Sequence, residues 1–406
     1  MQSAQEAIGD RVDLAERSRA LDHLPALDGV RGIAILLVVL FHSLVTVLVR
    51  VRQNLFDRLW GQVFGLGYCG VDLFFVLSGF LITRILLHSR NLPQGQYLKR
   101  FYVRRVLRIF PLYYLCLILA LVVLPLLYPL VLANETYRKS YEHQRWYWFY
   151  VQNLYPIVDP EHQPLLGLLS HFWSLSIEEQ YYLVWPFVVG VFRRSWQLVG
   201  FCLALCFLSF VFRVGLLLCG SNQLVPYFLT PGRLDSIAAG SMIAILMQED
   251  LLPRALLVRV ARQAVFAGLG LLVGTMVWQQ SVSPFKSAMA ATGSTAFALL
   301  FGGWLILVLT RKPDSGVTHA LMFSPLRAMG KYSYGIYVFH WPVCMWVHGW
   351  LPGSAFPRVG GSAVVHQATA TVVILALSTA FAVVSYHLFE QRFLALKSRF
   401  AEGNHR

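Results

Sequence analysis

An arginine and a histidine, Arg31 and His42, lie eleven residues apart in the first apolar stretch of the chain. Eleven steps of 100° come within about 20° of three full turns, so a helix places both side chains on one face, roughly 16 Å apart along its axis. An imidazole in that position can take a proton from a hydroxyl group. A structural role, with a hydrogen-bonded histidine and a snorkelling arginine, explains the spacing equally well.

A second set of polar residues opens the fourth apolar stretch. His171, Ser174 and Glu178 follow one another in steps of three and four residues, which brings them to one face of a helix. If both stretches cross a membrane, Glu178 lies about 10 Å and His42 about 13 Å below the outer surface. We therefore predict an acid–base pair in which the carboxylate raises the basicity of the imidazole and fixes its tautomer. A purely structural ion pair is the alternative.

The second apolar stretch also carries polar and small residues. Asp72 and Gly79 are seven residues apart and share a helical face, where the glycine lets a slender ligand or another backbone approach. Ser78 precedes this glycine. We count Asp72, Ser78, Ser174 and Tyr182 as candidate substrate-binding residues, although helix packing alone explains the glycine equally well.

The segment between the second and third apolar stretches, residues 84–108, contains seven Lys or Arg and no acidic residue. It ends in Arg104, Arg105 and Arg108. Arg104 and Arg108 are one helical turn apart and could form a cationic fork for phosphate groups. The alternative is ordinary cytoplasmic anchoring or contact with anionic lipid headgroups, and the residues alone favour it.

The elements that carry these residues are membrane helices. Hydrophobic residues make up 57% of the 406 residues and charged residues 13%, where a soluble domain has roughly a quarter charged. Stretches of about 20 apolar residues cross roughly 30 Å of hydrocarbon, and there only a helix satisfies its own backbone. We predict an all-α polytopic bundle with ten spans: 32–49, 70–88, 109–131, 171–192, 196–218, 227–248, 263–281, 289–310, 332–351 and 367–389.

The distribution of basic residues predicts the orientation of this bundle. Of the 34 Lys and Arg, 24 fall in segments on the side of the N-terminus and eight on the other, while Arg213 and Arg233 lie inside spans. Because cytoplasmic segments are enriched in Lys and Arg, both termini are expected in the cytoplasm. We divide the chain into a cytoplasmic segment 1–31 without a cleavable signal peptide, a transmembrane domain 32–390 and a cytoplasmic tail 391–406.

Composition also bears on partners. The net charge of +14 is spread between apolar spans, which fits membrane topology and the lipid bilayer, so we expect no nucleic-acid partner. The six cysteines lie mostly inside spans without ligand spacing, and no metal is expected. Arg233 and Asp235 are interpreted as structural, whereas His340 in the ninth span fits either a structural or a functional role.

Six motifs in order resemble the acyltransferase-3 family of integral membrane O-acyltransferases. They are LPALDGVRGI with FHS (24–43), GVDLFFVLSGF (70–80), YVRRVLRIFP (102–111), FWSLSIEEQYY (172–182), YSYGIY (332–337) and FE (389–390). The family's Arg-x10-His pattern matches Arg31 and His42, and its Arg-x-x-Arg pattern matches Arg105 and Arg108.

The resemblance implies a cytoplasmic acyl-CoA donor, usually acetyl-CoA. It implies as acceptor a hydroxyl of a cell-surface saccharide, such as a lipopolysaccharide or exopolysaccharide, or of a lipid-linked glycan at the outer face of the bacterial inner membrane. Some members acylate small molecules such as macrolides. Some relatives carry an outer esterase-like domain that this chain lacks, which suggests direct transfer or a separate outer-face partner protein.

In the resulting hypothesis, Arg31, Arg104, Arg105 and Arg108 hold the phosphates of the donor, and the thioester reaches His42. His42 acts as the base and Glu178 as its partner, with direct transfer and an acyl-enzyme both open. A proton-coupled transporter is the competing class, since intramembrane His, Glu and Arg also occur there. Against it, the sequence shows no inverted repeat and no paired broken helices.

Overall fold

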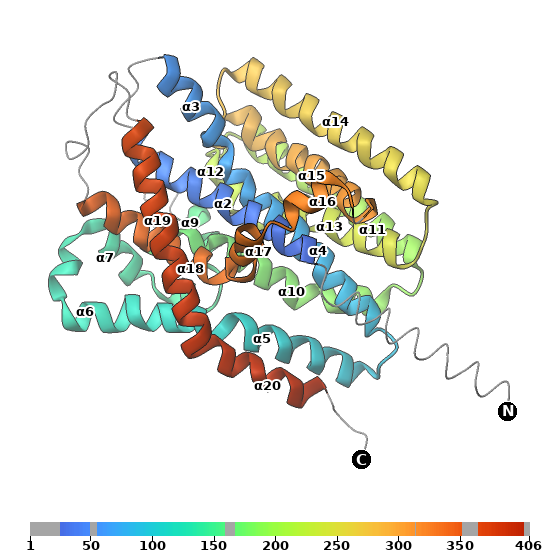
Figure 1. Ribbon diagram of the computed structural model, residues 1–406, viewed down its shortest axis with the longest axis horizontal. Coiled ribbons are helices and arrows are strands. Elements are labelled where there is room, and N and C mark those ends of the chain that lie inside the picture. The colour runs from blue at the N-terminus through green and yellow to red at the C-terminus, as the bar shows by residue number, and fades with distance from the viewer. Residues whose placement is uncertain (1–24, 49–54, 159–166, 313, 351–363, 402–406) are drawn as a thin grey trace.

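The computed structural model describes residues 25–48, 55–158, 167–312, 314–350 and 364–401, and within these ranges all regular structure is helical. Most of the predicted N-terminal segment and the end of the predicted tail lie outside the described residues. The described helices form one bundle with α2 and α4 in its middle, α14 beside α15 along one edge, and α5 beside α20 along another (Figure 1).

Each of the ten predicted spans corresponds to a long helix. These are α2 (Pro25–Leu48), α4 (Cys69–His88), α5 (Gln94–Ile118), α10 (Trp173–Val191), α11 (Ser195–Leu218), α13 (Leu234–Gln248), α14 (Arg254–Gln279), α15 (Ser287–Thr310), α18 (Ser333–Trp350) and α19 (Val364–Ser385). Shorter helices lie between them or, for the last, after them: α3 (Leu55–Gly65), α6 (Leu124–Leu127), α7 (Glu135–Glu142), α8 (Arg145–Trp148), α9 (Tyr155–Val158), α12 (Leu224–Phe228), α16 (Gly316–Leu321), α17 (Ser324–Lys331) and α20 (Gln391–Ala401).

Seven helical stretches of the described chain are long and apolar enough to cross a membrane: Pro25–Ser43, Trp60–His88, Gln94–Leu127, Ser195–Leu218, Arg254–Gln279, Ser287–Thr310 and Val364–Leu396. The protein is thus an all-α polytopic membrane protein. The helices α10, α13 and α18 fall outside this set. α13 has only 15 residues, fewer than the ~20 that span the hydrocarbon. Ten crossings therefore stay a prediction.

Several helices begin earlier than hydropathy predicts. α2 begins at Pro25, so that Arg31 lies inside a helix, and α5 begins at Gln94 and carries the whole second half of the basic segment. α14 begins at Arg254. Apolar runs mark only the hydrocarbon core, whereas a membrane helix continues into the headgroup layer with polar and basic side chains.

Glycines bring α4 and α13 into backbone contact. A Cβ atom at Gly79 would overlap the carbonyl of Ile237, and one at Gly240 would overlap the carbonyl of Val76. In lipid, where apolar burial gives helices little reason to associate, such close approach supplies the packing energy. The backbone that Gly79 accommodates is therefore that of α13.

Hydrogen bonds hold α10 against its neighbours. Tyr97 and Tyr102 of α5 donate their hydroxyls to the carbonyls of Pro186 and Leu183 at 3.0 and 2.7 Å. Trp185 donates its indole N–H to Thr83 of α4 at 2.7 Å. These bonds hold α10 in place against α5 and α4, and they thereby position the polar residues near the start of α10.

Candidate active site

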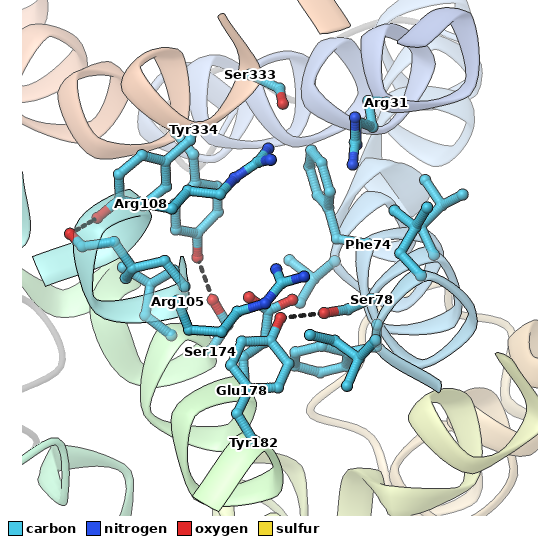
Figure 2. A pocket seen from close by; sticks show the side chains of 18 residues that line it. Arg31, Phe74, Ser78, Arg105, Arg108, Ser174, Glu178, Tyr182, Ser333 and Tyr334 are labelled. Carbon is cyan, nitrogen blue, oxygen red and sulfur yellow. Dashed lines mark hydrogen bonds between the residues drawn. The ribbon is translucent and has the colours of Figure 1, made fainter. Parts of the chain in front are cut away.

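A cavity of about 120 Å³ lies between α2, α4, α5, α10 and α18 (Figure 2). Apolar side chains form much of its wall, and its polar groups come from all five helices. The polar lining residues are Arg31, Ser78, Arg105, Arg108, Ser174, Glu178, Tyr182, Ser333, Tyr334 and Tyr337.

Three arginines approach this cavity from two helices. Arg31 of α2 is 22% exposed and pairs with Asp28 at 3.1 Å, while Arg105 of α5 lies over the ring of Tyr182. Arg108 is exposed. These three guanidinium groups outnumber the two carboxylates beside them, Asp28 and Glu178, and the remaining positive charge suits an anionic ligand with several oxygens, such as a phosphate.

Glu178 is the carboxylate of the cavity. Ser78 and Tyr182 present their hydroxyls to it, and Arg105 and Arg108 are the cations nearby. Ser78 and Tyr182 are also hydrogen-bonded to each other. The four-residue spacing predicts that Ser174 and Glu178 share a face, and both line the cavity.

A cluster of three histidines lies beside the part of the cavity wall that Tyr337 forms. His42 Nδ1 is 2.9 Å from the carbonyl of Val38 and 3.2 Å from His340 Nε2. The His171 ring stands edge-on to His340 with ring centres 5.0 Å apart, and its Nε2 contacts the carbonyl of Val338 at 3.1 Å. His171 and His340 are buried.

Tyr337 joins the cavity to this cluster. Its hydroxyl contacts Ser174 Oγ at 2.5 Å and donates to the carbonyl of His171 at 2.6 Å. Its own carbonyl is 2.6 Å from His340 Nδ1. One residue thus contacts the cavity and two of the three histidines.

The structure therefore brings Arg31, Ser78, Arg105, Arg108, Ser174, Glu178 and Tyr182 together around one cavity. His42, Asp72 and Arg104 are not among the lining residues. The described hydrogen bonds of the His42 ring lead to Val38 and His340, not to Glu178. The assignment of a role to each of these residues stays a prediction.

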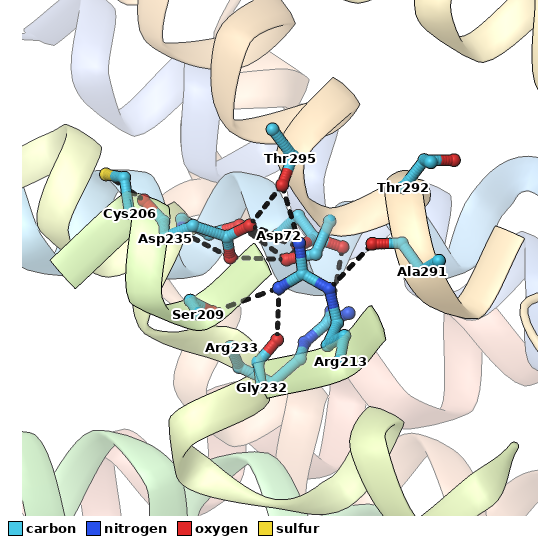
Figure 3. Close-up of polar contacts among 12 residues, drawn as sticks. Asp72, Cys206, Ser209, Arg213, Gly232, Arg233, Asp235, Ala291, Thr292 and Thr295 are labelled. Carbon is cyan, nitrogen blue, oxygen red and sulfur yellow. Dashed lines mark hydrogen bonds and ion pairs between the residues drawn. The ribbon is translucent and has the colours of Figure 1, made fainter. Parts of the chain in front are cut away.

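Asp72 belongs instead to a buried ion network (Figure 3). Arg233 Nη2 lies 2.8 Å from Asp72 Oδ2, and Arg213 Nη2 lies 2.8 Å from Asp235 Oδ2. Ser294 donates to both carboxylates, at 3.3 Å to Asp72 and 2.7 Å to Asp235. All four charged side chains are at most 3% exposed, and removing one partner of such a buried pair leaves a costly unpaired charge. The interpretation of Arg233 and Asp235 as structural agrees with these contacts.

The α18 side of the cavity was not predicted from the sequence. Ser333, Tyr334 and Tyr337 line the cavity, and Tyr334 donates to the carbonyl of Ile109 in α5 at 2.6 Å. Their motif is visible in the sequence, but the motif alone does not indicate which way α18 faces. Among the described residues, no set of three His, Cys, Asp or Glu side chains is arranged to hold a metal ion.

Comparison with known proteins assigns the family. A family model described as an acyltransferase domain matches residues 24–387, so the chain belongs to the acyltransferase-3 family. This match includes every helix that lines the cavity or contributes to the histidine cluster.

Three curated relatives align with most of the chain. The peptidoglycan O-acetyltransferase OatA of Listeria monocytogenes is 28% identical over 331 residues, 79% of this chain and 49% of the relative. The O-acetyltransferase OatA of Staphylococcus aureus is 27% identical over 82% of this chain and 53% of its own. The putative peptidoglycan O-acetyltransferase YrhL of Bacillus subtilis is 28% identical over 91% and 54%. The chain thus spans about half the length of these relatives, and no solved structure matches it.

Proposed function

We propose that this protein transfers an acetyl group from cytoplasmic acetyl-CoA to a hydroxyl of a cell-surface saccharide or lipid-linked glycan at the outer face of the bacterial inner membrane. The observation that carries the proposal is the three-arginine cavity, whose Tyr337 wall adjoins the histidine cluster. Family membership supports acyl transfer, and the names of the Listeria and Bacillus relatives support a cell-surface glycan acceptor.

The arginines of the cavity hold the donor in this proposal. Arg31, Arg105 and Arg108 bind phosphate oxygens of acetyl-CoA, because guanidinium groups offer paired N–H donors to such oxygens. Arg104 does not line the cavity and adds positive charge from outside it. Ser78, Ser174 and Tyr182 offer hydroxyls to the substrates along the wall, and Asp72 supports the site through α13.

His42 acts as the general base. It takes the proton of the acceptor hydroxyl while that oxygen attacks the thioester carbonyl, and the carbon–sulfur bond breaks to release the CoA thiolate. Glu178 assists through the field of its carboxylate, which lies in the cavity near Tyr337. Donor and acceptor then meet where the cavity adjoins the histidine cluster.

A transfer assay with purified protein tests this function. Wild-type protein should hydrolyse labelled acetyl-CoA slowly and transfer its acetyl group to extracted surface glycan. His42→Ala should bind acetyl-CoA normally and lose at least 100-fold in transfer, within the range that general bases contribute. Retention of more than a tenth of the activity would exclude His42 as the base. No thioester turnover by wild-type protein, with surface glycans unchanged in a deletion strain, would reject acyl transfer and return a proton-coupled carrier to consideration.

A further inference from the structure

Hydrogen bonds within α2 and within α18 decide which ring nitrogens of His42 and His340 carry protons. His42 Nδ1 lies 2.9 Å from the carbonyl of Val38, one turn back in α2. A carbonyl oxygen only accepts hydrogen bonds, so Nδ1 of His42 carries the proton and Nε2 keeps the lone pair. Nε2 is therefore the atom at which the neutral imidazole accepts a proton.

His340 is arranged in the same way on α18. Its Nδ1 lies 2.6 Å from the carbonyl of Tyr337 and therefore carries a proton. In the neutral ring the lone pair is then at Nε2, which lies 3.2 Å from His42 Nδ1. The N–H at His42 Nδ1 consequently donates to both the Val38 carbonyl and the His340 lone pair.

We infer that His340 is a positioning residue for His42: it orients the imidazole and stabilises the imidazolium that forms during acyl transfer. The inference rests on the proposed function. When His42 takes the proton of the acceptor hydroxyl at Nε2, its Nδ1–H becomes a stronger donor, and His340 Nε2 accepts that charge-assisted bond. Returning the proton to the solvent restores both neutral rings, so no further reactant is needed.

The surroundings of His340 favour a neutral acceptor. His340 is completely buried. Among the described residues, the titratable groups that face it are His42 from α2, His171 from the turn before α10, and Tyr337 from α18 itself. No carboxylate contacts the ring in this part of the chain. A lone pair on a fixed neutral ring therefore occupies the place that an aspartate takes in a Ser-His-Asp triad.

Two substitutions of His340 separate its hydrogen bonds. Glutamine can place its carbonyl oxygen near the position of Nε2, so His340→Gln keeps an acceptor for His42. Asparagine is shorter and can keep the bond to the Tyr337 carbonyl, so His340→Asn keeps the local fold and removes that acceptor. We expect His340→Asn to lower kcat by at least tenfold with acetyl-CoA binding unchanged, and His340→Gln to retain several times more activity.

The pH profile distinguishes positioning from a structural role. Loss of the acceptor makes the His42 imidazole less basic, so the rising limb of the kcat profile should move to lower pH in His340→Asn. The double variant His42→Ala/His340→Asn should be no slower than His42→Ala alone, because residues that act as one unit are not additive. Wild-type kcat with an unshifted profile in His340→Asn would overturn the inference while leaving His42 as the base. Full activity of His42→Ala would instead reject the proposed mechanism itself.

A measurement on unsubstituted protein covers the case in which the variants do not fold. Solid-state NMR of protein labelled with ¹⁵N-histidine reports which ring nitrogen carries the proton. At neutral pH, His42 and His340 should both be protonated at Nδ1. A proton at Nε2 of His42 would leave His340 without a bond to accept and would overturn the inference.

Discussion

Glu178 and Glu179 are adjacent in the sequence but face different surroundings. Glu178 lines the cavity and Glu179 does not. The charge of Glu179 acts on Tyr113, Tyr114 and Tyr334, whereas Arg105 interacts with both carboxylates. One helical step turns a side chain by about 100°, which accounts for the separation. A substitution of Glu178 therefore changes the cavity, and the same substitution of Glu179 serves as its control.

Glu178→Gln keeps the shape of the side chain and removes its charge. We expect kcat for acetyl transfer to fall by tenfold or more and its rising limb to shift to lower pH, because in the proposed mechanism His42 loses the field of the Glu178 carboxylate. Glu179→Gln should stay within about twofold of wild type. Should Glu179→Gln be the slower enzyme, the carboxylate that matters would lie outside the cavity, and the assigned role of Glu178 would be wrong.

The arginines of α5 allow a second comparison. Arg105 and Arg108 line the cavity and Arg104 does not. Loss of a hydrogen bond to a charged group costs about 1.5–3 kcal/mol, or roughly ten- to a hundredfold in Kd. We expect that loss of acetyl-CoA affinity for Arg105→Ala and Arg108→Ala, with a weaker salt dependence of the remaining binding. Calorimetric titration measures it, and equal weakening by Arg104→Ala would indicate a diffuse basic face instead of a cavity site.

At the residue scale, helical periodicity predicts which side chains share a face of one helix, but it does not predict which side chains of different helices contact each other. The spacing of Ser174 and Glu178 placed both on one face, and both line the cavity. The predicted membrane depths of His42 and Glu178 are similar, but depth does not specify rotation about the helix or what lies between the two residues. In the structure α18 supplies His340 to His42, a contact between residues 298 positions apart in the sequence.

At the element scale, the α4–α13 crossing depends on Gly79 and Gly240. A methyl group at either position would overlap a backbone carbonyl of the other helix. Backbone carbonyls cannot move aside as a flexible side chain can, so we expect Gly79→Ala and Gly240→Ala each to lower stability by about 1–3 kcal/mol. Thermal unfolding in detergent measures the change.

Gly274 of α14 supplies the control for this prediction. A Cβ atom there meets nothing within 4 Å. Because alanine is the better helix former by up to about 1 kcal/mol, Gly274→Ala should leave the melting temperature unchanged or raise it. A drop equal to that of Gly79→Ala would mean that the α4–α13 contact is not the cause.

Hydropathy predicted that the long helices exist, because each must satisfy its backbone within lipid. It did not predict where they begin, nor the π-helical turn at Tyr386–Glu390 that links α19 to α20. The glycine contact shows the same limit. Gly79 was consistent with a ligand or with a neighbouring helix, and only the packed bundle identifies α13 as its partner.

At the scale of the whole molecule, the number of crossings decides on which sides of the membrane the termini lie. The split of 24 to eight basic residues predicts both termini in the cytoplasm, which requires an even number of crossings, and ten satisfies that requirement. The seven stretches that meet the length and hydropathy requirement are an odd number. If only those seven crossed, the two termini would lie on opposite sides.

Reporter fusions or cysteine labelling at positions 4 and 404 distinguish these topologies, and both sites should report the cytoplasm. Two internal sites then locate any discrepancy: position 221, between α11 and α12, should be outside, and position 250, between α13 and α14, inside. α13 is the shortest of the ten helices, and its Asp235 and Ser236 contact Arg213 and Asp72 of neighbouring helices. We expect α13 to cross, because a short helix can cross where protein surrounds it. If positions 221 and 250 report the same side, α13 does not cross. The membrane depths of His42 and Glu178 would then need to be reassigned.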